Sequence, residues 1–268
     1  MKKKLLIPVF LAAMAAPLAL SQSANGLSAA FIGENTKSTY IAYGSELNGK
    51  ICDEGFVLLK NKNNYLPMRG NERISVCGKS STNLVQVGGG SGSGHNNGET
   101  EINLQQSLER VGFTLNGNLT SFYKDNNKSG SGRTNGNSGY KGISEVTIGE
   151  TAISAYSDSL INSLGQYNDC AIQVISREGS EGCDVKTCDV TDSVKGGFST
   201  KHALELSDNE QALFDLLNQK FENIIILINS GNIFQCDQFE NNDKVKAILW
   251  MGTPGCTGAG AVGRILTG

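Results

Sequence analysis

The sequence has few of the residues that metal sites and cysteine redox motifs require. It contains only two histidines, His95 and His202, and none of its 7 cysteines forms a Cys-x-x-Cys motif. A structural zinc site and a thiol nucleophile therefore have little support, and we expect no metal and no cofactor. Cys183 and Cys188 are the only close pair, and the sequence leaves open whether they form a disulfide.

Proline is scarce, and neither sign of charge dominates. The 4 prolines and 33 glycines favour a fold with many turns and glycine-lined loops over a helical bundle. The 23 basic and 26 acidic residues are scattered and give a net charge of -3, with no basic stripe. We therefore expect no nucleic-acid partner.

Long apolar runs are absent after the N-terminus. Met1 to Lys4 supply a positive segment, Leu5 to Leu20 an apolar stretch, and Ala19-Leu20-Ser21 a small-x-small cleavage site. This pattern predicts an export signal over residues 1–21, followed by an N-terminal extension over 22–50 and one main domain over 51–268. An uncleaved anchor is the alternative, but the run is short for a bilayer span. We expect an exported protein, periplasmic or extracellular, with no membrane contact after cleavage.

Three motifs of nucleotide-binding and hydrolytic proteins are incomplete. Gly78-Lys79-Ser80 resembles the end of a P-loop, but Arg73 stands where that motif needs its first glycine. The glycine run from Gly88 to Gly94 gives no G-x-G-x-x-G in any frame. No G-x-S-x-G elbow occurs, so a serine hydrolase lacks its nucleophile. A nucleotide-binding module is therefore a distant possibility.

Apolar periodicity predicts alternating helices and strands. Helices are expected over residues 51–61, 104–111, 157–167, 207–218 and 259–266, and strands over 74–77, 113–115, 170–176, 224–228 and 245–250. Ser207-Asp208-Asn209-Glu210 has the pattern of a capping box. The Asn-, Ser-, Gly- and Lys-rich stretch from Asp125 to Gly142 predicts a mobile surface insertion. The alternation predicts an α/β fold, a three-layer α/β/α sandwich with a mainly parallel central sheet.

One predicted strand ends in a loop rich in carboxylates. The apolar run from Ala171 to Ser176 continues as Arg177-Glu178-Gly179-Ser180-Glu181-Gly182-Cys183-Asp184. Ligands of open α/β sheets bind outside the carboxyl ends of the strands, which is where such a loop would lie. The structural alternative is a solvated turn.

Six segments carry a resemblance to a known family. They are Glu54–Asn61 with Leu66-Pro67, Gly90–Gly94, Ile175–Asp184, Leu206–Leu213, Leu227–Gly231 and Pro254–Gly268. In this order they resemble the second, sandwich domain of glycoside hydrolase family 3, the family of β-glucosidases and β-xylosidases. In that family, a nucleophile from a β/α barrel works with an acid/base from a loop of the sandwich domain. The resemblance implies Glu181 as the general acid/base, and it implies a substrate-binding set of Asp184, Arg177, Ser91, Ser93 and His95.

The sequence departs from the family pattern at two points. Gly179-Ser180 stands where the family usually has Ser-Gly, which leaves Glu181 in register. Val185 stands where an arginine often follows the aspartate, which removes a positioning contact. Structural interpretations stay open: Glu178 pairs with Arg177 or is solvated, and Trp250 packs in the core.

Retaining hydrolysis needs two carboxyl groups about 5 Å apart, and this chain supplies one of them. We therefore expect the acid/base-bearing domain of an exported glycoside hydrolase, incomplete without a β/α barrel in cis or in trans. Its substrate would be a β-linked oligosaccharide or an aryl glycoside. Whether the chain is a fragment, a split product or a separate domain stays open, as does activity on its own. The alternative function is a non-catalytic carbohydrate-binding or scaffold module.

Overall fold

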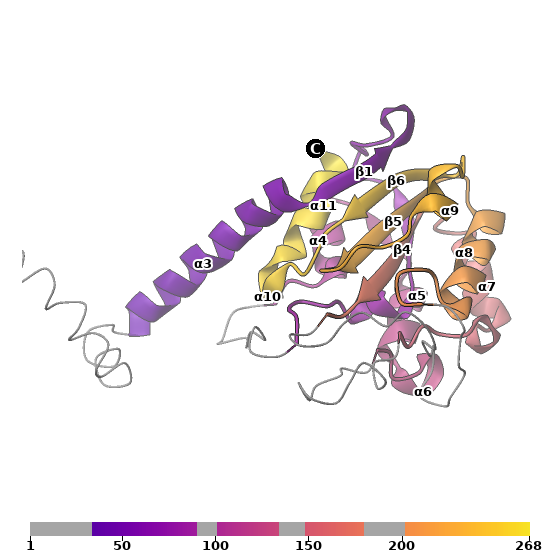
Figure 1. Cartoon of the computed structure of the whole chain (residues 1–268), viewed down its shortest axis with the longest axis horizontal. Helices are drawn as coiled ribbons and strands as arrows, with labels where there is room; N and C mark the ends of the chain where they lie inside the picture. The colour runs from indigo at the N-terminus through magenta and orange to yellow at the C-terminus, as the bar shows by residue number, and fades with distance from the viewer. Residues whose placement is uncertain (1–33, 90–100, 134–147, 180–201) are drawn as a thin grey trace, which may run out of the picture. The chain divides into compact units, whose positions relative to one another are not determined.

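The computed structural model describes residues 34–89, 101–133, 148–179 and 202–268 (Figure 1). The chain forms two compact units, Met1–Glu46 and Leu47–Gly268. Helix α3 (Glu34–Gly55) begins in the first unit and ends in the second. No helix among the described residues is long and apolar enough to cross a membrane.

The core of this unit is a six-stranded sheet with the order β1-β6-β5-β4-β2-β3. All neighbouring strands are parallel except β1, which pairs antiparallel with β6 at one edge. The predicted α/β class and mainly parallel sheet are therefore confirmed. The strands are β1 (Val57–Asn61), β2 (Arg73–Cys77), β3 (Thr114–Leu115), β4 (Cys170–Arg177), β5 (Ile224–Ser230) and β6 (Val245–Trp250).

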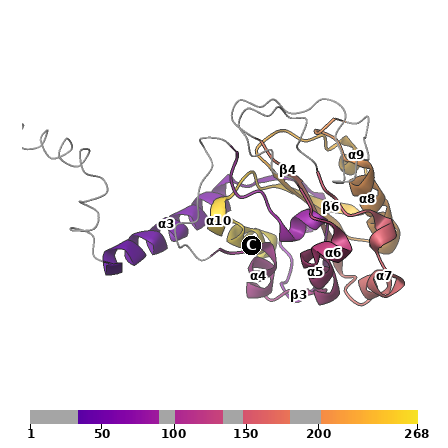
Figure 2. The same cartoon turned by 90° about the horizontal axis from the view of Figure 1, so that it is seen from below.

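Helices cover both faces of the sheet, which gives three layers (Figures 1 and 2). On one face lie α5, α7 and α8, and on the other lie α4 and α11. The helices are α4 (Leu104–Arg110), α5 (Gly117–Lys124), α6 (Asn126–Ser129), α7 (Asp158–Leu164), α8 (Asp208–Lys220), α9 (Asp237–Glu240), α10 (Gly255–Gly258) and α11 (Gly260–Thr267). Short 3-10 turns lie at η1 (Lys62–Asn64), η2 (Lys79–Thr82) and η5 (Ile153–Ala155).

Strand β5 shows why the central strands read so clearly in the sequence. Ile224, Ile226 and Ile228 join the core on one face, whereas Ile225 and Leu227 join the core on the other. A strand that is covered on both sides needs apolar residues at every position. The continuous apolar run thus predicted a central parallel strand correctly.

Local signals also placed several helix ends correctly. The Ser207 hydroxyl accepts from the backbone N–H of Glu210, whose carboxylate accepts in turn from the Ser207 N–H, so the predicted capping box is present. Gly112 follows α4 with a φ of 103°, a conformation that favours glycine. Gly263 lets α11 approach α4 closely, since a Cβ there would lie 2.2 Å from the Ser107 carbonyl oxygen.

Two sequence predictions were wrong. The expected helix over residues 51–61 ends at Gly55, and Val57–Asn61 forms β1 instead. Consecutive apolar residues do not distinguish a short strand from a helix, and pairing with β6 decides the outcome. Residues 125–133 of the expected mobile insertion are held in the fold, because α6 lies there and Ser129 is buried.

Candidate functional site

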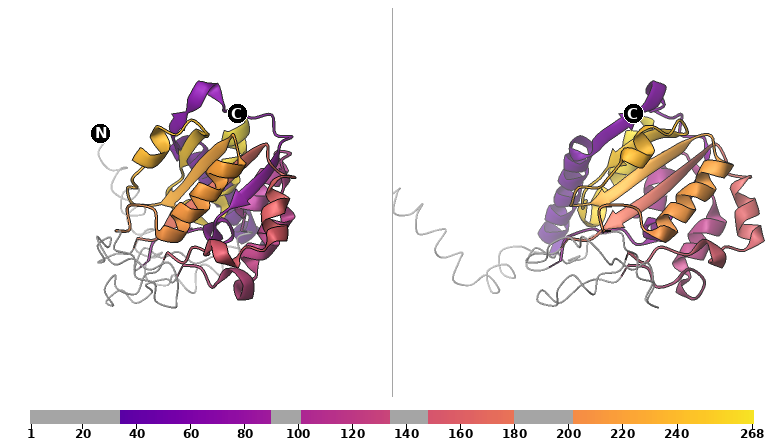
Figure 3. Two further views of the ribbon diagram at one scale, coloured as in Figure 1. Left: turned by 90° about the vertical axis from the view of Figure 1, so that its right-hand side faces the viewer. Right: turned by 45° about the vertical axis from the view of Figure 1, so that its right-hand side comes forward.

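The carboxyl ends of β2, β4, β5 and β6 lie along one edge of the sheet, and the arrows of β4, β5 and β6 point toward it, whereas the arrow of β1 points the opposite way (Figures 1 and 3). Arg177, the last residue of β4, is the one predicted site residue that the structure describes. The other predicted site residues, namely Glu181, Asp184, Ser91, Ser93 and His95, lie outside the described residues, and their roles stay predictions.

The two predicted site segments begin side by side. The Gly89 N–H donates to the Gly179 carbonyl oxygen at 2.9 Å. A Cβ on Gly88 would lie only 3.3 Å from the same oxygen. Gly89 is the last described residue before the glycine-serine segment, and Gly179 is the last before the segment that contains Glu181. Two segments that are far apart in the sequence therefore start at one point of the sheet edge.

Arg177 joins the two ends of the carboxylate-rich loop. Its side chain is 5% exposed and pairs through both terminal nitrogens with the Glu210 carboxylate, each at 2.7 Å. Its Nε and second Nη also donate to the carbonyl oxygens of Ala203 and Glu205, which follow the loop. The remaining N–H donates to the Ser176 carbonyl oxygen. One guanidinium thus fixes both the start and the end of the loop.

This geometry bears on the predicted role of Arg177. A guanidinium has five N–H donors, and all five donate to protein oxygens here. The ring of Phe234 lies 5.0 Å from the guanidinium carbon and adds a cation–π contact. Substrate binding by Arg177 stays a prediction, and the contacts support a positioning role.

Glu178 has a partner that the sequence did not suggest. Its carboxylate pairs with the Arg133 Nε at 3.0 Å, and the two side chains are 12% and 6% exposed. Arg133 also donates to the Asn83 carbonyl oxygen. The expectation that Glu178 pairs with Arg177 or is solvated was therefore wrong. A long-range ion pair leaves no signal in a stretch rich in Gly, Ser and Asn, so sequence reasoning missed Arg133.

Asn229 links three segments at the same edge. Its Oδ1 accepts from the Val85 N–H at 2.6 Å and from the Ser176 hydroxyl at 2.9 Å. Its Nδ2 donates to the carbonyl oxygens of Val85 and Gly252. The residue is fully buried. A polar residue that continues the apolar run of β5 was the available signal, and it was overlooked.

A second polar cluster lies beyond the end of β2. The Lys79 ammonium is buried and donates to the Tyr123 carbonyl oxygen, the Asn126 side chain and the Ser129 hydroxyl. Burial lowers the pKa of Lys79, and the nearby carboxylate of Glu150 partly offsets this. The Glu150 carboxylate accepts from the backbone N–H of Lys79. This network attaches the start of the insertion to the sheet edge.

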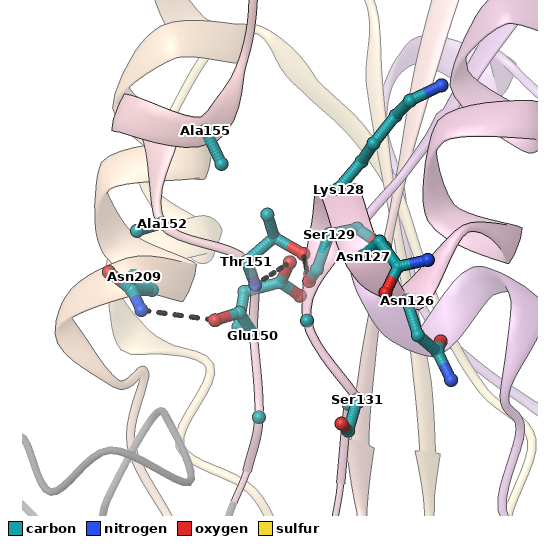
Figure 4. Close-up of a pocket in the computed structure, with 13 residues that line it drawn as sticks. Asn126, Asn127, Lys128, Ser129, Ser131, Glu150, Thr151, Ala152, Ala155 and Asn209 are labelled. Carbon is teal, nitrogen blue, oxygen red and sulfur yellow. Dashed lines mark hydrogen bonds between the residues drawn. The ribbon is translucent and has the colours of Figure 1, made fainter.

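A cavity of about 440 Å³ lies beside this cluster (Figure 4). Glu150, Thr151, Ser129 and Asn209 line its wall, and Lys128 points away from them. The Thr151 hydroxyl donates to the Ser129 carbonyl oxygen, and the Asn209 amide donates to that of Glu150. Among the described residues that line it, the buried polar groups are thus engaged within the protein. No cluster of three or more His, Cys, Asp or Glu suited to a metal occurs in the described ranges.

The predicted packing of Trp250 in the core is confirmed, since it is half-buried against the larger core cluster.

The model of the glycosyl hydrolase family 3 C-terminal domain matches residues 56–268. Beta-glucosidase A of Butyrivibrio fibrisolvens is 27% identical over 240 residues, which are 83% of this chain and 27% of the relative. Beta-glucosidase of Ruminococcus albus is 28% identical over 237 residues, 85% of this chain and 22% of the relative. The chain thus spans about a quarter of the length of these relatives.

Solved structures show the same fold. Beta-glucosidase 3B from Thermotoga neapolitana, in complex with glucose, matches with a TM-score of 0.65 and 24% identity over 85% of this chain and 29% of that one. A beta-glucosidase from Paenibacillus barengoltzii matches with a TM-score of 0.64 and 22% identity, over 84% of this chain and 23% of that one.

Proposed function

Because the chain belongs to the glycosyl hydrolase family 3 C-terminal domain family, we propose that it supplies the general acid/base of a β-glucosidase-like enzyme. The candidate residue is Glu181. It protonates the glycosidic oxygen while a carboxylate of a β/α barrel attacks the anomeric carbon, and it then takes a proton from water in the second step. The substrate is a β-linked oligosaccharide or an aryl β-glucoside.

The hydrogen bond between Gly89 and Gly179 is the observation that carries this proposal. It brings together Gly89 and Gly179, the last described residues before the two segments, which supports the proposal that Glu181, Ser91, Ser93 and His95 contribute to one site. The β-glucosidase names of the curated relatives support the substrate class.

The contacts of Arg177 support the same function. A general acid contributes only when it is held within hydrogen-bond reach of its oxygen. In this proposal, the Arg177–Glu210 pair keeps the two ends of the loop together, and the Glu178–Arg133 pair holds its first residue. Asp184 is proposed to bind a sugar hydroxyl of the substrate.

The test is complementation with a separately produced β/α barrel domain of glycoside hydrolase family 3. Turnover of an aryl β-glucoside should require both polypeptides. Glu181→Gln should lower kcat at least about 100-fold, since general acid/base catalysis contributes about 10² to 10⁴. Glu222→Gln is the control, because that carboxylate is exposed and lies outside the proposed site, and it should keep the native activity. Equal activity of Glu181→Gln and the native chain would exclude Glu181, and saturable glucan binding without turnover would favour a binding module.

We also propose that the protein is exported, because residues 1–21 have the composition of a cleaved signal. N-terminal sequencing of the protein from its native host should find a start near Gln22. A start at Met1 would contradict export by cleavage.

A further inference from the structure

Residues 125–133 form a compact segment beyond the carboxyl end of β2. They comprise α6 and the chain on either side of it. The Ser129 carbonyl oxygen accepts from the Thr151 hydroxyl at 2.7 Å, and the Ser129 hydroxyl accepts from the buried ammonium of Lys79 at 2.8 Å. We call residues 125–133 the strap. Contacts from two other segments therefore hold it in place.

The end of the strap is enclosed by its neighbours. A Cβ on Gly132 would lie 3.2 Å from the Lys79 side chain, and a Cβ on Gly149 would lie 2.1 Å from the Gly132 carbonyl oxygen. Gly132 also has a φ of 78°, a conformation that favours glycine. The backbone directly before Arg133 is therefore packed on two sides, which fixes the position from which the Arg133 side chain extends.

The Arg133 side chain reaches the segments that follow two strands of the sheet. Its Nη1 donates at 2.9 Å to the carbonyl oxygen of Asn83, which follows β2 and η2, and its Nε donates at 3.0 Å to the carboxylate of Glu178, which follows β4. The two charged side chains are 6% and 12% exposed. A charge-assisted hydrogen bond that is largely desolvated is stronger than an exposed one. Arg133 thus fixes Glu178 relative to the strap and to the end of β2.

Stability alone does not account for this ion pair. Burying two charges costs desolvation, and an apolar pair of similar volume is often at least as stabilising. A planar guanidinium that binds two acceptors at once has little freedom to turn. The pair is therefore better explained by the orientation that it gives to Glu178.

Three consecutive residues, 177–179, are each held by a different segment. The partners come from α8, the strap and the segment after β2, and they are Glu210, Arg133 and Gly89. Glu181 follows two positions after the last of the three, and two residues span at most about 7 Å. The anchors at the end of β4 thus lie within a short length of chain from the proposed acid.

We propose that Arg133 is a positioning residue for the general acid/base, acting through Glu178 on the start of the segment that contains Glu181. This inference rests on the proposed function, which assigns the proton transfer to Glu181. A general acid works only within hydrogen-bond reach of its oxygen, and a displacement of about 1 Å can cost about 100-fold in rate. Loss of Arg133 therefore slows the step that needs proton donation.

The test compares two leaving groups, with the full chain and a separately produced β/α barrel domain of glycoside hydrolase family 3. Arg133→Met should lower kcat/KM for an alkyl β-glucoside about 10-fold or more. It should change the value for a dinitrophenyl β-glucoside by less than about threefold, because that group leaves without help from an acid. A loss of folded protein would lower both values equally. Arg73→Met is the matched control, since Arg73 is exposed at the amino end of β2, and it should leave both values unchanged.

Two further variants separate the ion pair from other effects of the substitution. Arg133→Met combined with Glu178→Gln should be no slower than Arg133→Met alone, because the two residues act as one unit. Arg133→Lys keeps the charge without the planar fork, so it should lose less activity and show the same preference between leaving groups. It also keeps the test decisive if circular dichroism shows that Arg133→Met is unfolded.

Two results would overturn the positioning role. They are native kcat/KM values for both glucosides in Arg133→Met, and an equal loss for both, which indicates a structural effect. The proposed function is judged separately by Glu181→Gln. If that variant shows no preference between the leaving groups, the acid/base assignment fails, and the inference for Arg133 fails with it. A selective loss in Glu181→Gln with none in Arg133→Met would contradict the positioning role alone.

Discussion

Two borders of the sheet differ in how their side chains are accommodated. At the carboxyl ends of β4 and β5, Arg177 and Asn229 are buried, and their polar atoms are engaged in contacts to several segments. Along β1, three apolar side chains in sequence are exposed. At the first border the polar groups are satisfied by contacts within the domain, whereas at the second border the apolar side chains stay exposed. The two borders therefore differ in how far the domain satisfies its own side chains.

Among substitutions at the two borders, Arg177→Met should lower the free energy of unfolding most. Removing the guanidinium leaves the Glu210 carboxylate buried without its ion-pair partner, which costs about 3 to 5 kcal/mol. Urea denaturation should show this loss, and Arg177→Met with Glu210→Leu should recover part of it. Glu222→Gln is the control, because its pair with Lys244 is at the surface and contributes about 0 to 1 kcal/mol. Equal stability of Arg177→Met and the native chain would contradict a stabilising role for the Arg177–Glu210 pair.

Asn229→Ala should have the next largest effect, about 2 to 3 kcal/mol. It leaves the Val85 and Gly252 backbone groups and the Ser176 hydroxyl without their partner, and unsatisfied buried groups cost about 1 to 3 kcal/mol. Thermal unfolding measures the loss. Asn223→Ala, which removes one exposed hydrogen bond to Asp169, should change stability by less than about 0.5 kcal/mol. Comparable losses in both variants would contradict the claim that the buried hydrogen bonds of Asn229 stabilise the fold more than an exposed one does.

Alkaline pH should destabilise the interior that supports the site. Burial raises the pKa of Cys170 from 9.0 to about 12. The unfolded chain thus loses this proton first, so the stabilisation is complete below pH 9, decreases as the pH rises, and is gone above about pH 12. At pH 10 the loss from this thiol is about 1.4 kcal/mol. Cys170→Ala should reduce the slope of stability against pH, and an unchanged slope would contradict the assignment.

The smallest effect on folding should come from the β1 edge. Leu58→Ala should change the free energy of unfolding of the isolated chain by less than about 0.5 kcal/mol, because the side chain is 42% exposed. The same substitution at Leu227, which is buried in the core, should cost about 2 to 5 kcal/mol. Urea denaturation of both variants sharpens the comparison. A large loss at Leu58 would mean that the edge is part of the core.

The contrast between the borders also explains what the sequence predicted. The central strands and the capping box depend on local pattern, so β4, β5, β6 and the start of α8 were recognised. Strand β1 depends on its pairing with β6, which no local pattern records, and it was read as a helix.

For the candidate site too, the sequence predicts one part, its location, and does not predict another, its contacts. Its location after β4 follows from the order of elements. The contacts that fix it, such as Arg133 with Glu178, join residues 45 positions apart. Such pairs are decided by the packed structure, and a single sequence contains no measure of them.

The central claim is that Glu181 donates a proton to the leaving oxygen. Its most direct test is the dependence of the glycosylation rate on the leaving group, in the native and Glu181→Gln chains with the barrel domain. A dinitrophenyl glucoside departs with little protonation, so the variant should nearly match the native chain in that step, whereas with an alkyl or sugar leaving group it should be slower by about 10² or more. A loss of equal size for both classes would contradict proton donation by Glu181.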